Sequence, residues 1–250
     1  GLGIGPSIPL ILRGPAPTVS WAPPRLDTAR ADTIDRLAAL YAARDPELAR
    51  VFEAGVQIDR MAAGDMAKDP KDDPGLSRLQ RNFVELARGA ARLMADGDGP
   101  RVAALSYDGW DTHTQEGAGD GRLTRLLGGL DLALDALKSG MGDAWKDTAV
   151  VVVTEFGRTA RENGADGTDH GNGAAAFLLG GAVKGGRVIA DWPGLKERDL
   201  LDNRDLMPTT DLRAVLKGVL QDHLGVPAGV LAERVFPGSA GVAPTRDLFA

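Results

Sequence analysis

The sequence predicts an α/β protein whose first hundred residues are mainly helical. Apolar residues recur at helical spacing between residues 28 and 94, whereas after Pro100 short apolar runs alternate with further helical patterns. A strand, helix, strand order predicts right-handed parallel crossovers and a sheet that is covered on both faces. In such sheets ligands bind beyond the carboxyl ends of the strands. The polar residues that follow the apolar runs are therefore the first candidates for a site.

Composition limits the classes of protein to which the chain can belong. With 250 residues, 43% of them hydrophobic, the chain is long enough to bury one full core. A net charge of −6 and a pI near 5.1 argue against a nucleic-acid partner, which needs a clustered basic face. The absence of cysteine excludes disulfides and thiolate sites. No run approaches the roughly 18 apolar residues of a membrane helix and no signal peptide is recognisable, so we expect a soluble chain that is not an integral membrane protein.

Three helices are expected in the first hundred residues. Residues 1–25 are rich in Gly and Pro and predict loop or extended structure, with no strand of convincing length. Helical patterns follow in residues 28–43, in a stretch that begins at Pro46, and in residues 76–94. Residues 68–75 (KDPKDDPG) have the composition of a solvated linker.

Strands and helices then alternate in the second part of the chain. Apolar runs predict strands, and leucine-rich periodic patterns predict helices. The expected strands are residues 102–107, 149–154, 174–179 and 187–190, and the expected helices are residues 123–137 and 210–224. Punctuation by Pro and Gly in residues 225–250 predicts a segment that wraps the surface.

Acidic residues and histidines follow two of the predicted strands. Asp111 and His113 are two residues apart, which places both side chains on one face of an extended backbone. Glu155 comes directly after the next strand, and Asp169 with His170 follows in a glycine-rich loop. Carboxylate oxygens and imidazole nitrogens suit Zn²⁺, Mn²⁺ or a similar divalent ion. These five residues are the candidate metal ligands.

Each candidate also has a structural interpretation, and the residue pattern leaves both open. Asp111 and Asp169 lie beside glycines and are typical of turns or caps. Glu155 could form an ion pair with Arg158 or Arg161. Arg158 could bind the oxygens of a phosphate or sulfate, or form a surface salt bridge. His223, the third histidine, is more typical of a helix C-terminus.

Several spaced motifs together resemble the DUF1501 family. In chain order they are GWDTH (109–113), TEFGRT (154–159), GTDHG (167–171), LLGGAVKGGRV (178–188), PTTDLRAVL (208–216), LGV (224–226) and VFPG (235–238). The resemblance extends over roughly residues 1–248, and its specificity comes from the agreement of several motifs. This family is a bacterial group of unknown function that is related to the alkaline phosphatase and sulfatase superfamily.

The resemblance implies an alkaline-phosphatase-like three-layer α/β/α sandwich with a mostly parallel sheet. Residues 1–250 would form a single domain of this kind that lacks its N-terminal strand or strands. Within it, residues 28–95 would be the helical part, residues 100–224 the α/β core with the site motifs, and residues 225–250 the C-terminal wrap.

The resemblance also implies roles for the candidate residues. Asp111 and His113 resemble the first ligand set of the superfamily, Glu155 its acidic residue, and His170 its later histidine. The chain departs from the superfamily at Phe156, where a metal-binding histidine is expected. The nucleophile of these enzymes lies upstream in longer relatives, and no residue of this chain replaces it, so we expect the nucleophile outside this chain.

Two classes of function remain. The first is a metal-dependent hydrolase of phosphate or sulfate esters, with Arg158 binding the anionic substrate and Zn²⁺, Mn²⁺ or Ca²⁺ as the cofactor. The alternative is a catalytically inactive metal-binding or assembly domain. The resemblance suggests a bacterial and exported protein, while the sequence itself specifies neither the compartment nor the oligomeric state.

Overall fold

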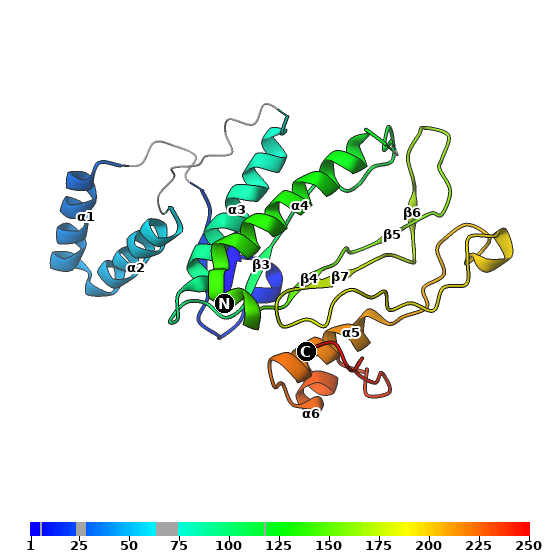
Figure 1. The fold of residues 1–250 in the computed structure, drawn as a ribbon. Helices are drawn as coiled ribbons and strands as arrows, with labels where there is room; N and C mark the ends of the chain where they lie inside the picture. Colours follow the sequence, from blue (N-terminus) through cyan, green and yellow to red (C-terminus); the bar gives the residue numbers. More distant parts are fainter. Residues whose placement is uncertain (6, 24–28, 64–74, 118) are drawn as a thin grey trace. The chain divides into compact units, whose positions relative to one another are not determined.

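The chain is a mixed helix and strand protein, as the sequence predicts. The structure, a computed structural model, describes residues 1–250 except residues 6, 24–28, 64–74 and 118 (Figure 1). Its residues fall into two compact units. Unit 1 comprises residues 1–109 and 125–143, and unit 2 comprises residues 110–124 and 144–250.

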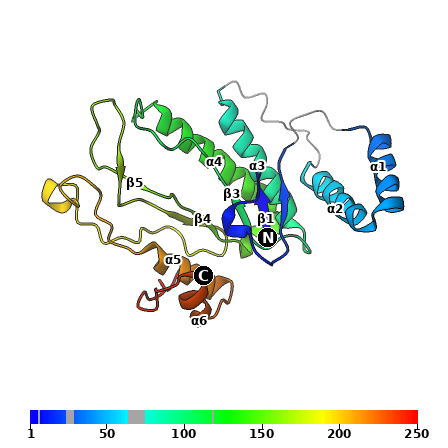
Figure 2. The ribbon, with the colours of Figure 1, turned by 180° about the vertical axis from the view of Figure 1, so that it is seen from behind.

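A three-stranded parallel sheet lies at the centre of unit 1. Strand β1 (Leu2–Ile4) pairs with β2 (Val19–Trp21) on one side and with β3 (Ala103–Leu105) on the other, both in parallel (Figure 2). All three residues of β1 are buried. The first 25 residues are thus extended in part, as predicted, but they supply the central strand. Three-residue strands between Gly and Pro are too short to give a periodic signal.

The three helices predicted before residue 100 are present, and so is the helix predicted over residues 123–137. They are α1 (Ala31–Arg44), α2 (Pro46–Ala63), α3 (Arg78–Ala95) and α4 (Arg122–Met141). Ser77 and Gln80 form a reciprocal capping box at the start of α3. Apart from Gly75, the predicted linker lies outside the described residues. None of the helices in the described part of the chain has the length and hydrophobicity of a membrane span.

Helices α3 and α4 pack closely against each other in the core of unit 1. Val84 and Ala87 of α3 pack with Ala133 of α4. Small residues allow this contact, because a Cβ atom at Gly140 would lie only 2.7 Å from Ala91. The phenyl ring of Phe83 also stacks on Tyr107 at 4.1 Å between ring centroids.

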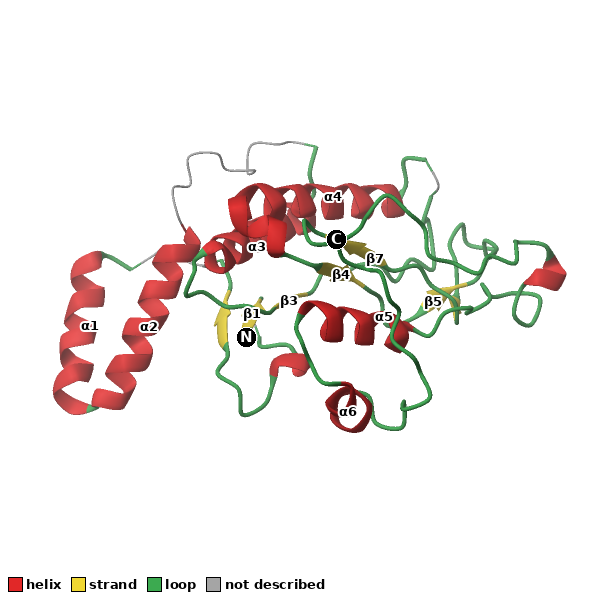
Figure 3. Ribbon diagram, turned by 60° about the horizontal axis from the view of Figure 1, so that its bottom comes forward, coloured by secondary structure: helices red, strands yellow, loops and turns green. Residues whose placement is uncertain are grey.

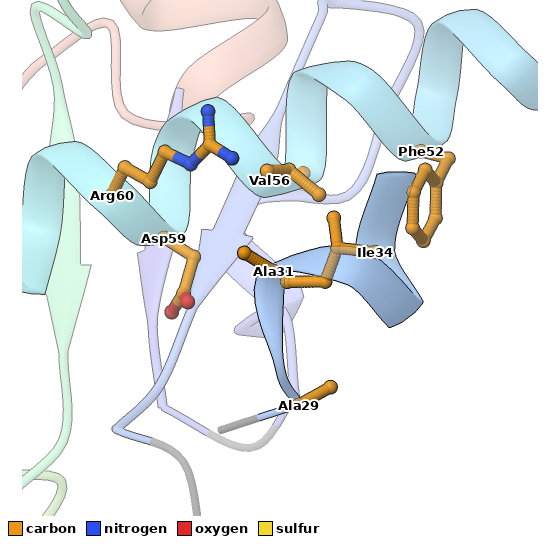
Figure 4. A pocket seen from close by; sticks show the side chains of 8 residues that line it. Ala29, Ala31, Ile34, Phe52, Val56, Asp59 and Arg60 are labelled. Carbon is orange, nitrogen blue, oxygen red and sulfur yellow. The ribbon is translucent and has the colours of Figure 1, made fainter. Parts of the chain in front are cut away.

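A shallow hollow of about 440 Å³ lies between α1 and α2 (Figure 4). Its lining is mainly apolar and contains no histidine. The lining residues are Ala29, Ala31, Ile34, Phe52, Gly55, Val56, Asp59 and Arg60. Asp59 also accepts a hydrogen bond from the indole nitrogen of Trp21 at 3.3 Å, which connects α2 to β2.

Unit 2 is built from short antiparallel pairs joined by long loops (Figure 3). Strand β4 (Val150–Val152) pairs with β7 (Phe177–Leu179), and β5 (Gly157–Arg158) pairs with β6 (His170–Gly171). The strands predicted over residues 149–154 and 174–179 are therefore present, but shorter. The order of strand 102–107, helix 123–137 and strand 149–154 predicts parallel pairing by a crossover. The partner that the structure gives β4 is antiparallel β7, because residues 153–176 turn back along the strand.

Residues 187–190, predicted as a strand, are not a strand in the structure. Val188 is 90% exposed and Ile189 is 53% exposed, so the apolar run that suggested a strand has no sheet partner to bury it. A run of four residues gives a weak signal, and two preceding glycines favour an irregular backbone.

The C-terminal segment is attached to the predicted 210–224 helix. This helix consists of α5 (Leu212–Gly218), capped by Asp211, and a π-helical turn η5 (Val219–His223). The ammonium group of Lys217, only 4% exposed, donates to the carbonyl oxygens of Ser239 at 2.5 Å and Val242 at 2.9 Å. After α6 (Ala228–Val230) and a second π-helical turn, the chain thus returns along α5.

We expect Gly89→Ala to destabilise the protein by about 1–3 kcal/mol, the usual range for overpacking. A Cβ atom at Gly89 would lie 2.1 Å from the Trp21 ring, which is almost fully buried. The measurement is the midpoint of urea unfolding. Gly55→Ala in α2 is the control, because nothing lies within 4 Å of its Cβ position. The control should be stabilising by about 0.5–1 kcal/mol, and equal effects of both variants would contradict this packing.

Candidate metal centre

Backbone hydrogen bonds join two segments of unit 2 that are about fifty residues apart in the sequence. The amide of Thr168 donates to the carbonyl of Thr112 at 3.2 Å, Gln115 donates to Ala165 at 3.1 Å, and Glu116 donates to Asp166 at 2.7 Å. The hydroxyl of Thr168 adds a hydrogen bond of 2.7 Å to the Glu116 carboxylate. Residues 112–116 are therefore fixed against the loop that follows β5.

Glycine is required where these segments touch. A Cβ atom at Gly167 would lie 2.3 Å from the carbonyl group of His113. The short β5–β6 pair then sets Arg158 opposite His170. Thr112 is 1% exposed, so its neighbours Asp111 and His113 point together to the opposite, accessible side of an extended segment. The predicted acid and histidine motifs are thus brought together.

Three cationic or proton-bearing groups converge on one oxygen of Asp111. Nε2 of His113 lies 3.0 Å from Oδ1, Nε2 of His170 lies 2.9 Å from it, and Nη2 of Arg158 donates to it at 3.1 Å. The side chains of Asp111, His113 and His170 are 57%, 44% and 50% exposed, so a ligand can reach them from solvent. Two imidazole nitrogens and one carboxylate oxygen therefore lie close together on an accessible surface.

His113 is held from its other side by a second carboxylate. Its Nδ1 atom lies 3.0 Å from Oδ1 of Asp169. The amide group of Asn163 donates to that same oxygen at 3.0 Å and to the backbone carbonyl of His113 at 3.0 Å. A carboxylate that holds one imidazole nitrogen fixes the ring and directs the other nitrogen toward a metal.

Phe156 and Arg158 support the other side of the cluster. The Phe156 ring stacks on His170 with 4.1 Å between centroids and 16° between planes, and the Arg158 guanidinium lies 5.1 Å from the Phe156 centroid. Arg158 also donates to the carbonyls of Thr168 at 2.7 Å and Trp110 at 2.6 Å. Its side chain, 20% exposed, therefore fastens the two segments to each other.

Both carboxyl groups are held in the ionised state. The hydrogen bond from His170, followed by the charges of His113, His170 and Arg158, lowers the pKa of Asp111 below its usual value. The hydrogen bond from Asn163, then the one from His113, lowers the pKa of Asp169. Ionised carboxylates are the form that binds a cation.

The residues fit a divalent metal ion. Ligand atoms of Asp111, His113 and His170 all lie within 4.8 Å of one another, the one such group found in the part of the chain that the structure describes. A neutral imidazole carries only one N–H, so it cannot donate to both Asp111 and Asp169. A metal at Nε2 of His113, with Nδ1 donating to Asp169, would be compatible with both contacts.

The remaining predicted site residues lie around this group. Asp169 contacts His113 instead of joining the three clustered donors. Glu155 is exposed, two residues before β5, and is not one of the three donors found among the described residues. Whether either binds a metal stays a prediction, as does anion binding by Arg158. The sequence analysis missed Asn163, although Asn before Gly is a common turn signal.

His223 has a role apart from the cluster. It ends the π-helical turn η5, and its ring stacks on Phe249 with 5.0 Å between centroids. The expectation of a histidine at a helix C-terminus is therefore met.

Comparison with known proteins assigns the family. The model of the DUF1501 family, described as a protein of unknown function, matches residues 21–235. The chain belongs to the DUF1501 family. No curated protein and no solved structure gives a match. The region that the DUF1501 match covers includes every residue of the cluster.

In this DUF1501 protein, we expect His170→Ala to raise the pKa of Asp111 toward the ordinary aspartate value of about 3.9, because the largest cause of the depression is removed. A depressed folded-state pKa stabilises the folded state above the unfolded pKa, and this contribution is lost as the pH falls through the folded value. The wild type therefore retains it to a lower pH than the variant. Carboxyl ¹³C NMR titration in the presence of a chelator measures the shift.

The Asp111→Asn variant assigns the resonance in that titration, and His223→Ala is the control. An Asp111 pKa that does not change in His170→Ala would contradict the contact.

Proposed function

We propose that this chain binds a divalent metal ion through Asp111, His113 and His170 and that it belongs to the metal-dependent hydrolases of phosphate or sulfate esters. The observation that carries the proposal is the approach of both Nε2 atoms to one oxygen of Asp111, at 3.0 Å and 2.9 Å. Two imidazole nitrogens and a carboxylate oxygen form a donor set that favours Zn²⁺ or Mn²⁺ over Ca²⁺, which prefers oxygen alone.

The residues of the cluster would have different roles in such a site. His113 and His170 offer imidazole nitrogens, and Asp111 offers a carboxylate whose pKa is lowered, so that it is ionised. Asp169 holds the His113 ring by Nδ1, and Phe156 holds the His170 ring by stacking. A bound divalent ion would supply Lewis-acid polarisation of an ester oxygen and a more acidic bound water. The role of the residues in this chain that would contact the ion is to bind it and to fix its position.

We also propose that the fold is of the alkaline phosphatase type. The parallel β2-β1-β3 sheet, with α3 packed on β1 and β3, supports a layered α/β arrangement. The order of the DUF1501 motifs, with ligands after the strands, supports the same assignment.

A second candidate is a metal-binding domain that has no catalytic activity. In the described residues, the side chains that pair with or stack on Asp111, His113 or His170 from outside this trio are those of Phe156, Arg158 and Asp169. None of these is the Ser, Thr or Cys nucleophile that the superfamily resemblance implies. This observation favours metal binding without ester hydrolysis.

We expect His113→Ala and His170→Ala each to lower the affinity for Zn²⁺ or Mn²⁺ by at least tenfold, because each removes one ligand of the site. Asp169→Asn should lower it by about 10–100-fold, the usual effect of losing an outer partner. Calorimetric titration and elemental mass spectrometry of the purified protein are the measurements. His223→Ala, the one remaining histidine, should bind as the wild type does. Equal affinity in all four variants would refute the site.

We expect the metal-loaded protein to hydrolyse aryl phosphate or aryl sulfate esters, with activity lost on chelation and restored by the metal. The measurement is release of nitrophenol from the two esters, with His113→Ala as the inactive control. Stoichiometric metal binding without turnover of either ester would reject the hydrolase and leave the second candidate.

A further inference from the structure

A tight turn places Arg204 beside the cluster. Leu201 and Asp205 form an antiparallel bridge across this turn, and a second bridge joins Asp205 to Thr159, which follows β5 directly. The amide of Ala160 also donates to the carbonyl of Arg204 at 3.0 Å. The backbone of Arg204 is therefore fixed against the same β5 segment that carries Arg158.

A buried carboxylate orients the Arg204 side chain. Asp205 is only 3% exposed. Its Oδ1 atom lies 2.8 Å from Nε of Arg204, and its Oδ2 accepts from Nη2 at 3.3 Å and from the amide of Asn172 at 3.0 Å. Asp205 thus occupies the Nε and Nη2 edge of the guanidinium. Nη2 also donates to the carbonyl oxygen of His170, and the described residues make no hydrogen bond or ion pair with Nη1, so Nη1 is the nitrogen that can donate to a ligand.

The guanidinium lies next to the metal-binding residues and remains in contact with solvent. Its Nη2 atom is 3.5 Å from the carbonyl oxygen of His170, and its positive charge also contributes to the lowered pKa of Asp169. The Arg204 side chain is 60% exposed. The guanidinium is therefore accessible to a ligand, and its pairing with Asp205 fixes its orientation.

Arg158 is less suited to this task than the sequence suggests. Its two terminal nitrogens already donate to two backbone carbonyls and to Asp111, and its side chain is 20% exposed. To bind an anion, Arg158 would have to release bonds that hold the two segments together. Arg204 can bind one without losing its pairing with Asp205.

We propose that Arg204, oriented by Asp205, binds the tetrahedral anionic group of the substrate at this centre. This inference rests on the proposed function, because the anion would lie between the metal and the guanidinium. The N–H groups of Nη1 can donate to the oxygens of a phosphate or sulfate, and the guanidinium adds a permanent positive charge.

The experiment measures binding of inorganic phosphate and of inorganic sulfate by calorimetry, with and without one equivalent of retained metal. Arg204→Ala should weaken anion binding by about tenfold or more. Arg204→Lys, which keeps the charge but not the fork, should fall between this variant and the wild type. Affinity for the metal alone should change by less than about twofold in both variants, because the guanidinium is not a ligand. Unfolding midpoints confirm that the variants fold.

Arg161→Ala is the matched control, since Arg161 is 61% exposed, lies in the same unit and pairs with Glu197 at 3.8 Å. Its anion affinity should equal that of the wild type. Equal weakening in Arg161→Ala and Arg204→Ala, an unchanged affinity in Arg204→Ala, or absence of anion binding by the wild type in both metal states would overturn the inference. If the wild type binds no metal, the proposed function fails, while the metal-free titrations still decide the role of Arg204.

Discussion

The candidate centre depends on the hydrogen bonds that join residues 112–116 to residues 165–168. They join parts of the chain about fifty residues apart and bring His113 and His170 to the carboxylate of Asp111. The pairing needs a glycine at position 167, because any Cβ atom there would overlap the His113 carbonyl. The buried Thr112 between the two ligands fixes which face they share. The site is thus a product of backbone pairing between loops, without support from a long strand.

The charges around His113 are suited to a cation. Asp111 and Asp169 are both held ionised and both face His113. One neutral imidazole can donate to only one of them. Arg158 offsets part of the negative charge of Asp111. The same guanidinium also donates to the backbone carbonyls of Thr168 and Trp110, which hold it on their side of the carboxylate. A metal at the Nε2 atoms would complete the balance and leave Asp169 as the partner that orients His113.

Sequence reasoning identified the candidate ligands that the structure brings together, because their signal is local. It missed Asn163 and Arg204, because their positions depend on tertiary contacts. Asp111 and His113 stand two apart after an apolar run, which fixes their common face in any extended segment. Asn163 and Arg204 lie in polar loops, where a binding residue looks like a turn residue until its partners are known. The same limit applies to the fold. Helices of 14 to 20 residues were predicted correctly, whereas β1 is too short for a periodic pattern and its burial comes from its two neighbours.

Phe156 contributes packing to the candidate site and no ligand atom. The superfamily pattern predicts a histidine at this position, which would add a ligand on the side of Glu155. A phenyl ring cannot bind a metal, but here it stacks on His170 and receives the Arg158 guanidinium on its face. The ring therefore holds one candidate ligand, His170, in place. Glu155, without the neighbouring histidine, stays exposed and outside the three donors found among the described residues. Among the described residues, the geometry therefore offers one cluster of candidate ligands, Asp111, His113 and His170, to a metal ion.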